Sequence, residues 1–419
     1  MNNNLIFCPS NHLLLDAATC PICGWQRPPD LPQGSLLWQP VSLSCGIGGP
    51  ARETYFRPGV VNDIAVFPLR SGELVALSRQ DGSAIWKSDA SPELFPRQLF
   101  SNGNDLFGVV ADNRSLEKAG NGYLARIDTK TGSLEKMWES FGFTMTNPVF
   151  GESLIFTRTA KPHLVALDRA DLNRVIWDVP LKSYKPISPV VTDDLVLTWD
   201  GEVTREKMVL KAFQAKDGNA IWQTDIDDID NNPVVWGDVF LYTTRKNELG
   251  AIKILNDKEV WSRTFEKIYS NICVLGDKMF VVVRDSESAE ESGHYFLICL
   301  DPQSGECLWK NNIGFRAQEV VALPDGNLYV GMGDPRFALC SSINGEILWD
   351  YSFGEDRTHR IQTHMVIDNG ICWLGTYDGT IAAFQLMKEN VQSENPEELL
   401  TSSKFEEAAC VFALQGDLT

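Results

Sequence analysis

The sequence lacks the features that mark exported and membrane-spanning proteins. Its first residues, MNNNLIFCPSNHLLLD, contain no basic segment followed by a long apolar run, so they do not resemble a signal peptide. No stretch approaches the roughly 18 consecutive apolar residues that a membrane-spanning helix needs. We therefore expect a cytoplasmic protein that does not bind a membrane, and we expect its ten cysteines to be reduced thiols.

Basic residues are also scarce. The chain has 37 Lys and Arg residues against 56 Asp and Glu residues, which gives a formal net charge of −19. Nucleic-acid binding depends on the neutralisation of phosphates by Lys and Arg, so this balance excludes nucleic acid as the expected partner. The sequence likewise contains no Gly-rich phosphate loop, no nucleophile motif and no HExxH metalloprotease motif.

The sequence does contain an internal repeat that ends in tryptophan. Eight Trp residues recur at quasi-regular distances, namely Trp38, Trp86, Trp138, Trp177, Trp222, Trp261, Trp309 and Trp349. In a typical unit, LVALSRQDGSAIW (74–86), alternating apolar residues predict a strand with one buried face, and a polar turn then reverses the chain. Four positions before the Trp stands a residue that tolerates left-handed backbone geometry, namely Gly82, Gly218, Gly305, Gly345, Asn173 or Asp257. The Trp is predicted to anchor each unit on the next one.

Two more strand candidates precede each unit, as in NPVVWGDVFLYTT (232–244). Each repeat thus has about four strands in about 40 to 50 residues, which is the period of a propeller blade. A β-sandwich would have similar strand spacing, but a Trp at one fixed place in every unit favours radial repetition. We therefore predict an all-β fold, an eight-bladed β-propeller over residues 34–386.

The number of blades depends on the two ends of this region. Seven complete units end at Trp86 through Trp349, and residues 363–386 then supply three further strands without a fourth. GSLLW (34–38) has the Gly-to-Trp spacing of a fourth strand, but no strands precede it. We predict that residues 34–43 are the outer strand of the eighth blade, which closes the ring without an unpaired edge.

These units resemble the repeats of the PQQ-type β-propeller family, which read as a strand, an Asp, a Thr-Gly turn and a Trp. TKTG (129–132), PQSG (302–305) and LVALDR (164–169) match that pattern best, and the resemblance covers about residues 34–386. The family includes quinone-cofactor alcohol dehydrogenases, an outer-membrane assembly lipoprotein and propellers that bind no quinone. The resemblance therefore implies a fold rather than an activity.

A quinone-dependent enzyme would need features that this chain does not have. Quinoprotein dehydrogenases of the family are generally exported and longer, and carry adjacent cysteines against the cofactor, a calcium site and a catalytic Asp. This sequence has no Cys-Cys pair, and the cysteines of its repeats are scattered at positions 273, 299, 307, 340 and 372. A free Cys is usually a small buried apolar residue. We expect neither bound quinone nor catalysis.

The segment CPSNHLLLDAATCPICGW near the N-terminus resembles a short zinc ribbon. Cys20 and Cys23 are two residues apart, so their thiolates can occupy adjacent corners of a tetrahedron, and Cys8 and His12 can occupy the others. Four protein ligands predict structural zinc rather than a catalytic site. The alternatives are ordinary buried cysteines, or an iron–sulfur cluster, which usually needs more thiolates. We assign residues 1–33 to this module and its proline-rich linker.

Residues 387–419 differ in composition from the repeats. They contain two Lys against six Glu and one Asp, a local charge of −5. Apolar residues fall near helical spacing and predict an acidic, partly helical tail, which resembles the first helix of a tetratricopeptide-like repeat. Its partner-binding candidates are Leu399, Leu400, Phe405 and Phe412. The alternatives are that this helix docks on the propeller itself, or that it belongs to a helical region that continues beyond Thr419.

Three other segments are weaker candidates. DIDDIDNN (225–232) could hold calcium but lacks the Gly turn and distal Glu of an EF-hand, so we interpret it as a solvated loop between blades. RDSESAEESGH (284–294) reads as an acidic insertion between strands. His359 and His364, five positions apart, favour ordinary packing over a metal site.

Taken together, these features predict a non-catalytic cytoplasmic scaffold that binds protein partners. We expect it to be one part of a larger multidomain or multiprotein bacterial-type assembly, with structural zinc as its only cofactor. The alternative is a sensor propeller with a small molecule at its axis, or a quinone-dependent dehydrogenase. The sequence does not identify the partner or the oligomeric state.

Overall fold

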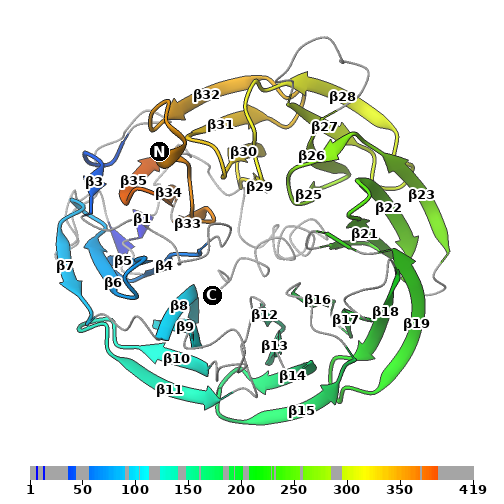
Figure 1. Cartoon of the computed structure of the whole chain (residues 1–419), viewed down its shortest axis with the longest axis horizontal. Coiled ribbons are helices and arrows are strands. Elements are labelled where there is room, and N and C mark those ends of the chain that lie inside the picture. Colours follow the sequence, from blue (N-terminus) through cyan, green and yellow to red (C-terminus); the bar gives the residue numbers. More distant parts are fainter. Residues whose placement is uncertain are drawn as a thin grey trace.

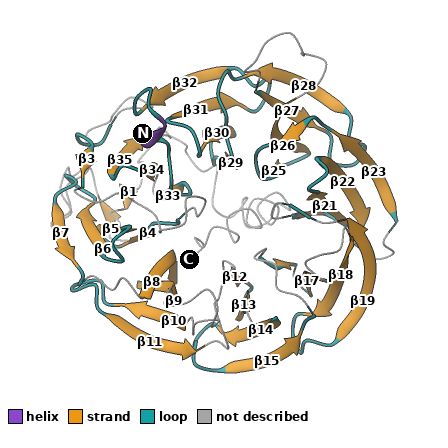
Figure 2. Cartoon of the chain, in the orientation of Figure 1, coloured by secondary structure: helices purple, strands orange, loops and turns teal. Residues whose placement is uncertain are grey.

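A computed structural model gives the fold of the chain. It describes residues 6–7, 13–14, 36–43, 56–89, 94–102, 104–112, 123–139, 148–159, 162–182, 188–192, 194–201, 207–227, 229–230, 233–254, 258–284, 295–368 and 370–385. Within these residues the chain forms strands and turns, apart from one short 3-10 turn at Arg357–His359 (Figure 2). No helix in the described part is long and apolar enough to cross a membrane.

Eight antiparallel sheets are arranged radially around a central axis (Figure 1), which confirms the predicted eight-bladed β-propeller. In each blade the first strand lies nearest the axis and the last lies on the outer rim. Blades 1 to 4 consist of β4 (Gly59–Val61), β5 (Ile64–Pro68), β6 (Leu74–Ser78) and β7 (Ala84–Lys87); β8 (Leu94–Asn102), β9 (Asp105–Asp112), β10 (Tyr123–Ile127) and β11 (Leu134–Glu139); β12 (Val149–Phe150), β13 (Leu154–Arg158), β14 (His163–Asp168) and β15 (Val175–Pro180); and β16 (Val190–Val191), β17 (Leu195–Asp200), β18 (Lys207–Gln214) and β19 (Ala220–Asp227).

The other four blades follow the same plan, except that the inner strand of blade 6 is divided in two. Blades 5 to 8 consist of β20 (Val234–Trp236), β21 (Val239–Thr243), β22 (Glu248–Lys253) and β23 (Glu259–Thr264); β24 (Lys267–Ile268), β25 (Cys273–Leu275), β26 (Lys278–Arg284), β27 (Phe296–Leu300) and β28 (Cys307–Asn312); β29 (Glu319–Ala322), β30 (Asn327–Gly331), β31 (Arg336–Ser341) and β32 (Ile347–Ser352); and β33 (Val366–Asp368), β34 (Ile371–Gly375), β35 (Thr380–Gln385) and β3 (Val41–Ser42).

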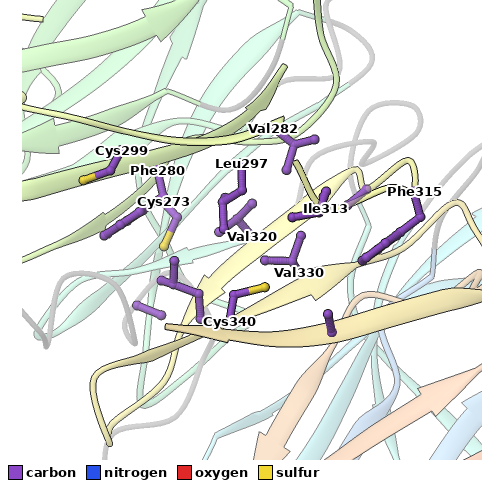
Figure 3. Packing of buried hydrophobic residues seen from close by; sticks show 14 residues of the cluster. Cys273, Phe280, Val282, Leu297, Cys299, Ile313, Phe315, Val320, Val330 and Cys340 are labelled. Carbon is purple, nitrogen blue, oxygen red and sulfur yellow. The ribbon is translucent and has the colours of Figure 1, made fainter. Parts of the chain in front are cut away.

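The core consists of apolar layers between neighbouring blades. Between blades 6 and 7, Phe280 and Leu297 lie in one cluster with Val320 and Val330 (Figure 3). The middle strands are covered on both faces, so their sequences are nearly all apolar, as in VFLYT of β21. The outer strands alternate between covered and exposed residues, because only one of their faces meets a neighbour.

The Trp residues join each blade to the next. Trp86, Trp177 and Trp261 donate a hydrogen bond from Nε1 to a backbone carbonyl in the following blade, at 2.7 to 2.9 Å. The ring also lies against a glycine of that blade, and this glycine has a φ of +70° to +74° in the turns at Gly82, Gly132, Gly218, Gly305 and Gly345. A Cβ at any of these positions would lie within 3 Å of a Trp ring atom. The predicted role of the Trp as an anchor is confirmed.

Blade 3 departs from the predicted turn. Asn173 does not have a positive φ, although it occupies the position of the glycine in other blades. This turn has one extra residue, and Arg174 N donates a hydrogen bond to the carbonyl of Asp171 at 2.9 Å, which reverses the chain without left-handed geometry. Leu172 of the same turn is buried in the cluster against which Trp138 packs. Asp257, the other non-glycine, lies outside the described residues.

An N-terminal strand completes the ring. β3 pairs with β35, with Val41 opposite Ile381, and Leu37 N donates a hydrogen bond to the carbonyl of Ala383 at 2.9 Å. Trp38 lies against Gly82 of blade 1, just as Trp86, Trp177, Trp261 and Trp309 lie against a glycine of the following blade. Blade 8 is therefore built from both ends of the described propeller.

The strand directions give the disc two distinct faces. We call one the glycine-turn face, because it carries the turns between third and fourth strands. We call the other the connection face, because it carries the segments between blades and the turns between second and third strands. Pairing of β3 with β35 places Leu36 and Gln385 toward the glycine-turn face. The predicted zinc module and tail, apart from the short strands β1 (Ile6–Phe7) and β2 (Leu13–Leu14), lie outside the described residues.

Candidate functional site

Exposed apolar side chains do not gather in one patch of the described surface. Most lie on the outer strands, beside the repeat Trp of their blade. They are Ile85, Val175, Ile176, Ile221, Val260, Leu308 and Leu348, with Ile343 in a nearby turn. Because the strands that carry them belong to six different blades around the rim (Figure 1), they reflect the repeat rather than a single binding site.

The predicted ligand and partner residues lie outside the described part of the chain. These are Cys8, His12, Cys20 and Cys23 of the zinc module and Leu399, Leu400, Phe405 and Phe412 of the tail. In the described residues, no group of three or more His, Cys, Asp and Glu side chains is placed to hold a metal ion. The acidic insertion at 285–294 is also outside these residues.

The acidic segment DIDDIDNN is partly strand rather than wholly loop. β19 extends as far as Asp227, so Asp225 lies in the outer strand of blade 4, where it is exposed. Asp230 is also exposed, and its backbone N–H donates a hydrogen bond to the carbonyl of Thr243 at 2.9 Å. The strand continues because its backbone pairs with β18 up to Lys207.

The described cysteines divide into two kinds. Cys273, Cys299, Cys340 and Cys372 are buried, as predicted, and burial raises the pKa of the first three thiols to about 12. Such thiols are poor nucleophiles because they stay protonated. Cys307 differs from the prediction. It is exposed at the start of β28, the outer strand of blade 6.

The two histidines have separate structural partners. His359 Nδ1 lies 2.8 Å from Asp378 Oδ2, whereas His364 Nδ1 lies 2.9 Å from Glu319 Oε1. Glu319 is buried near the axis, and its other oxygen accepts a hydrogen bond from Met365 N at 2.9 Å. These contacts join blades 7 and 8, and they support the interpretation of the histidines as packing residues.

A cluster of tyrosine and arginine side chains begins on the connection face of blade 6. The rings of Tyr269 and Tyr295 have centroids 5.2 Å apart, and the guanidinium of Arg316 lies 5.5 Å from the centroid of Tyr269. Arg316 follows β28 in the segment that leads to blade 7, and its side chain is exposed. Nearby, the guanidinium of Arg336 lies 5.1 Å from the Phe315 ring.

The cluster continues around Asp334 of blade 7. Burial raises the pKa of this carboxyl, while a hydrogen bond from Arg336 N and the positive charge of Arg336 oppose the rise. Arg316 and Arg357 act on Asp334 in the same direction. Three guanidinium groups therefore lie near one half-buried carboxylate.

Blades 8 and 1 supply the other end of the cluster. The backbone of Ile361 donates a hydrogen bond to the carbonyl of Asp334 at 3.0 Å, which brings the adjacent Arg360 into the same surface. The guanidinium carbon of Arg360 lies 4.0 Å from the centroid of Tyr377, and that of Arg70 lies 4.1 Å from it. We call the whole set the arginine–tyrosine surface. Its members are Arg70, Tyr269, Tyr295, Arg316, Arg336, Arg357, Arg360 and Tyr377.

The composition of this surface favours binding to another protein. Tyr and Arg are, with Trp, enriched at the centres of protein interfaces, because they combine apolar area with directed hydrogen bonds. The sequence reasoning did not identify it. A signal was present in FGEDRTHR (353–360), which has three basic residues in a strongly acidic chain. The other members are far apart in sequence and meet only in the folded ring.

The propeller region matches one protein family and two curated relatives. A family model described as Outer membrane protein assembly factor BamB matches residues 70–291 and 296–392, more than half of the chain. A curated relative with that name from Yersinia pestis is 24% identical over 365 residues, which cover 82% of this chain and 80% of the relative. Another, from Legionella pneumophila (strain Paris), is 27% identical over 176 residues, which cover 38% of this chain and only 41% of the relative.

Solved structures share the fold at low sequence identity. BamB from Moraxella catarrhalis has a TM-score of 0.53 and 14% identity, with 83% of this chain and 97% of that chain covered. The quinohemoprotein alcohol dehydrogenase ADHIIG from Pseudomonas putida HK5 has a TM-score of 0.56 and 11% identity, with 84% and 76% covered. Because an enzyme and an assembly factor share this architecture, the fold does not decide the activity.

These matches correct one prediction and establish one membership. The predicted cytoplasmic location is wrong, because the matching family and both curated relatives are described as outer membrane protein assembly factors. That prediction relied on the first residues of the chain, whereas the matches rest on the propeller repeats. Since the family model covers more than half of the sequence, the chain belongs to the outer membrane protein assembly factor BamB family.

Proposed function

We propose that this protein is a non-catalytic scaffold that holds a protein partner within a larger assembly. The observation that carries the proposal is the arginine–tyrosine surface on the connection face. Membership of a family named for an assembly factor supports it, as do two curated relatives of the same name. An assembly factor acts through contacts with other proteins, and this surface offers the side chains that such contacts use.

The surface rests on a rigid frame. Asn271 of blade 6 accepts a hydrogen bond from Val320 N at 2.9 Å and donates one to the carbonyl of Val320 at 3.1 Å, which fixes blade 7 beside blade 6. His364 N donates to the carbonyl of Phe56 at 2.7 Å, which fixes blade 1 beside blade 8. A partner would thus meet side chains that are already held in place, so little conformational entropy is lost on binding.

Reversing the charge of one exposed arginine on this surface should release the partner. We expect Arg316→Glu to lower partner recovery about tenfold or more, because it places a carboxylate where the partner meets a guanidinium. Tagged full chain and variant are incubated with host extract, and the recovered proteins are quantified by mass spectrometry. Arg174→Glu is the matched control, because Arg174 is an exposed arginine on the glycine-turn face.

Specific partners are those recovered by the wild type and the control but lost with Arg316→Glu. Equal recovery with all three proteins would contradict the proposed surface.

The apolar tail positions Leu399, Leu400, Phe405 and Phe412 stay a proposed second contact. A chain without residues 394–419 tests them in the same measurement, provided that its melting temperature is unchanged.

We also propose a structural zinc ion in the N-terminal module, held by Cys8, His12, Cys20 and Cys23. The short strands β1 and β2 pair with Phe7 opposite Leu13, and Cys8 and His12 are the next residues inward in the sequence. This register supports their pairing as two of four ligands. Thiolate and imidazole ligands in a closed set of four suit structural zinc.

The purified protein should contain about one zinc ion per chain. Cys20→Ser and Cys23→Ser should each lower the zinc content, measured by mass spectrometry of the metal, because each removes a thiolate. The propeller should keep its melting temperature, because its blades do not need the module to close. A metal-free wild-type protein would rule out the site.

A further inference from the structure

Tyr377 lies between two arginines from different blades. Arg70 is in the turn after β5 of blade 1, and Arg360 is in the segment between blades 7 and 8. Their guanidinium carbons lie 4.1 Å and 4.0 Å from the same ring centroid. A guanidinium this close to the centroid leaves no room for a second one on the same face, so the two lie on opposite faces and at most about 8 Å apart. Stacking on an aromatic face holds each guanidinium in place.

Neighbouring backbone contacts fix the geometry of this sandwich. Tyr377 N donates a hydrogen bond to the carbonyl of Arg360 at 2.9 Å, and Asp378 N donates to the carbonyl of Thr358 at 3.1 Å. These bonds tie the β34–β35 turn to the segment that carries Arg360. Arg360 and the ring of Tyr377 are therefore positioned before any ligand arrives, and Arg70 is placed by its stacking on that ring.

Neither guanidinium has an ion-pair partner among the residues that the structure describes. Arg360 Nε donates a hydrogen bond to Gln362 Oε1 at 3.2 Å, which leaves its remaining N–H groups available. The nearby carboxylates have other partners. Asp378 contacts His359, and Glu73 lies 2.8 Å from the ammonium of Lys87.

A third carboxylate in this region is also engaged. Asp356 accepts a hydrogen bond from Thr358 N at 2.9 Å, at the start of the 3-10 turn. The contacts of Asp378 with Thr376, Thr380 and His359 outweigh the effect of its burial, and together they lower the pKa of its carboxyl. Asp378 therefore stays ionised. Its two carboxylate oxygens contact His359 and Thr376, and among the described residues it forms no ion pair with Arg70 or Arg360.

The spacing of the two guanidinium groups matches an extended acidic peptide. A guanidinium presents paired N–H donors that fit a carboxylate, and it gives up its hydration more easily than an ammonium does. In an extended strand, side chains two positions apart project to the same side, about 6.5 to 7 Å apart. Two carboxylates on alternate residues can thus each meet one arginine. Membership of a family described as a protein assembly factor favours a protein segment over a nucleic-acid backbone as the ligand.

We infer that the Arg70–Tyr377–Arg360 sandwich binds an extended acidic segment of a partner protein, with carboxylates on alternate residues. This inference rests on the proposed scaffold function and names the chemistry of the partner. The probe is a fluorescein-labelled peptide of sequence GGEGEGG, and its comparison peptide, GGEEGGG, has the same composition with its two acids adjacent. Binding to the full chain is measured by fluorescence polarisation at low salt.

We expect the alternating peptide to bind more tightly than its isomer. Arg70→Gln and Arg360→Gln should each weaken binding about tenfold, because each removes one charge-assisted contact. Tyr377→Leu should weaken it as well, because both arginines lose their support. Arg174→Gln, on the opposite face, should bind as the wild type does. Thermal melting confirms that each variant is folded.

Equal affinity of the two peptides, or equal affinity of wild type and folded Arg70→Gln and Arg360→Gln, would overturn the inference. So would a loss with Arg174→Gln as large as with the others, because binding would then follow net charge alone. The scaffold proposal is judged separately, by partner recovery with Arg316→Glu. If that recovery is lost while the peptide does not bind, only the acidic-segment inference fails.

Discussion

Deletion of residues 1–43 is expected to destabilise the propeller severely, whereas deletion of residues 1–33 is expected to leave it folded. The longer deletion removes β3 and so leaves β35 as an unpaired edge next to the core. It also removes Leu36, Leu37, Trp38 and Leu43, which pack against two of the apolar clusters. The shorter deletion keeps all of these contacts. Thermal unfolding followed by near-UV circular dichroism compares the two chains.

A point substitution isolates the Trp in this closure. Trp38 lies against Gly82 of blade 1, and its ring centroid is 6.1 Å from that of Trp373. Trp38→Ala should lower the free energy of unfolding by about 2–4 kcal/mol, since a partly buried indole is lost and a cavity remains. If both truncated chains melt at the same temperature, β3 is not the strand that holds the ring closed.

The second large effect is expected at a glycine between blades. Gly305 has a φ of +70°, and a Cβ there would lie 2.5 Å from Cδ2 of Trp261. Trp261 has little room to move, because it is 9% exposed and its Nε1 donates to the carbonyl of Pro302 at 2.9 Å. We expect Gly305→Ala to lower the free energy of unfolding by about 2–4 kcal/mol, from left-handed strain together with overpacking. Urea denaturation measures it.

The matched control is another left-handed glycine without a neighbour. Gly276 has a φ of +59°, and a Cβ there would meet no atom within 4 Å. Gly276→Ala should therefore cost only the backbone strain, about 1–2 kcal/mol. The double variant Trp261→Leu with Gly305→Ala should lose less free energy of unfolding than the sum of the two single variants. The reason is that the smaller Leu removes the ring atoms with which the new Cβ would clash. Equal losses for the two glycine variants would show that the Trp ring moves aside freely.

Much of the fold could be predicted from the sequence because the contacts that define a blade are local. Alternating apolar residues, a polar turn and a terminal Trp all lie within one unit such as 74–86, and neighbouring units meet through that Trp. Counting these units predicted eight blades, and the Gly-to-Trp spacing in GSLLW predicted the eighth outer strand. The turn at Asn173 was mispredicted because one extra residue changed the hydrogen bonding of the turn.

The candidate surface could not be predicted in this way, because its members are not neighbours in any repeat. Arg70 and Tyr377 are about 300 positions apart in the sequence, and they meet only because blade 8 closes against blade 1. Arg316 likewise meets Tyr269 across blade 6, because the segment that leaves its outer strand returns to its inner strand. No spacing rule in the sequence encodes such pairs.

The sequence by itself determined the repeat, its strands and its tryptophan anchors, since short-range alternation and turn chemistry fix these. Only the tertiary structure decided which side chains share the connection face. Ring closure brings segments from four blades together there, so that Arg70 of blade 1 and Arg360, which precedes blade 8, meet at the ring of Tyr377.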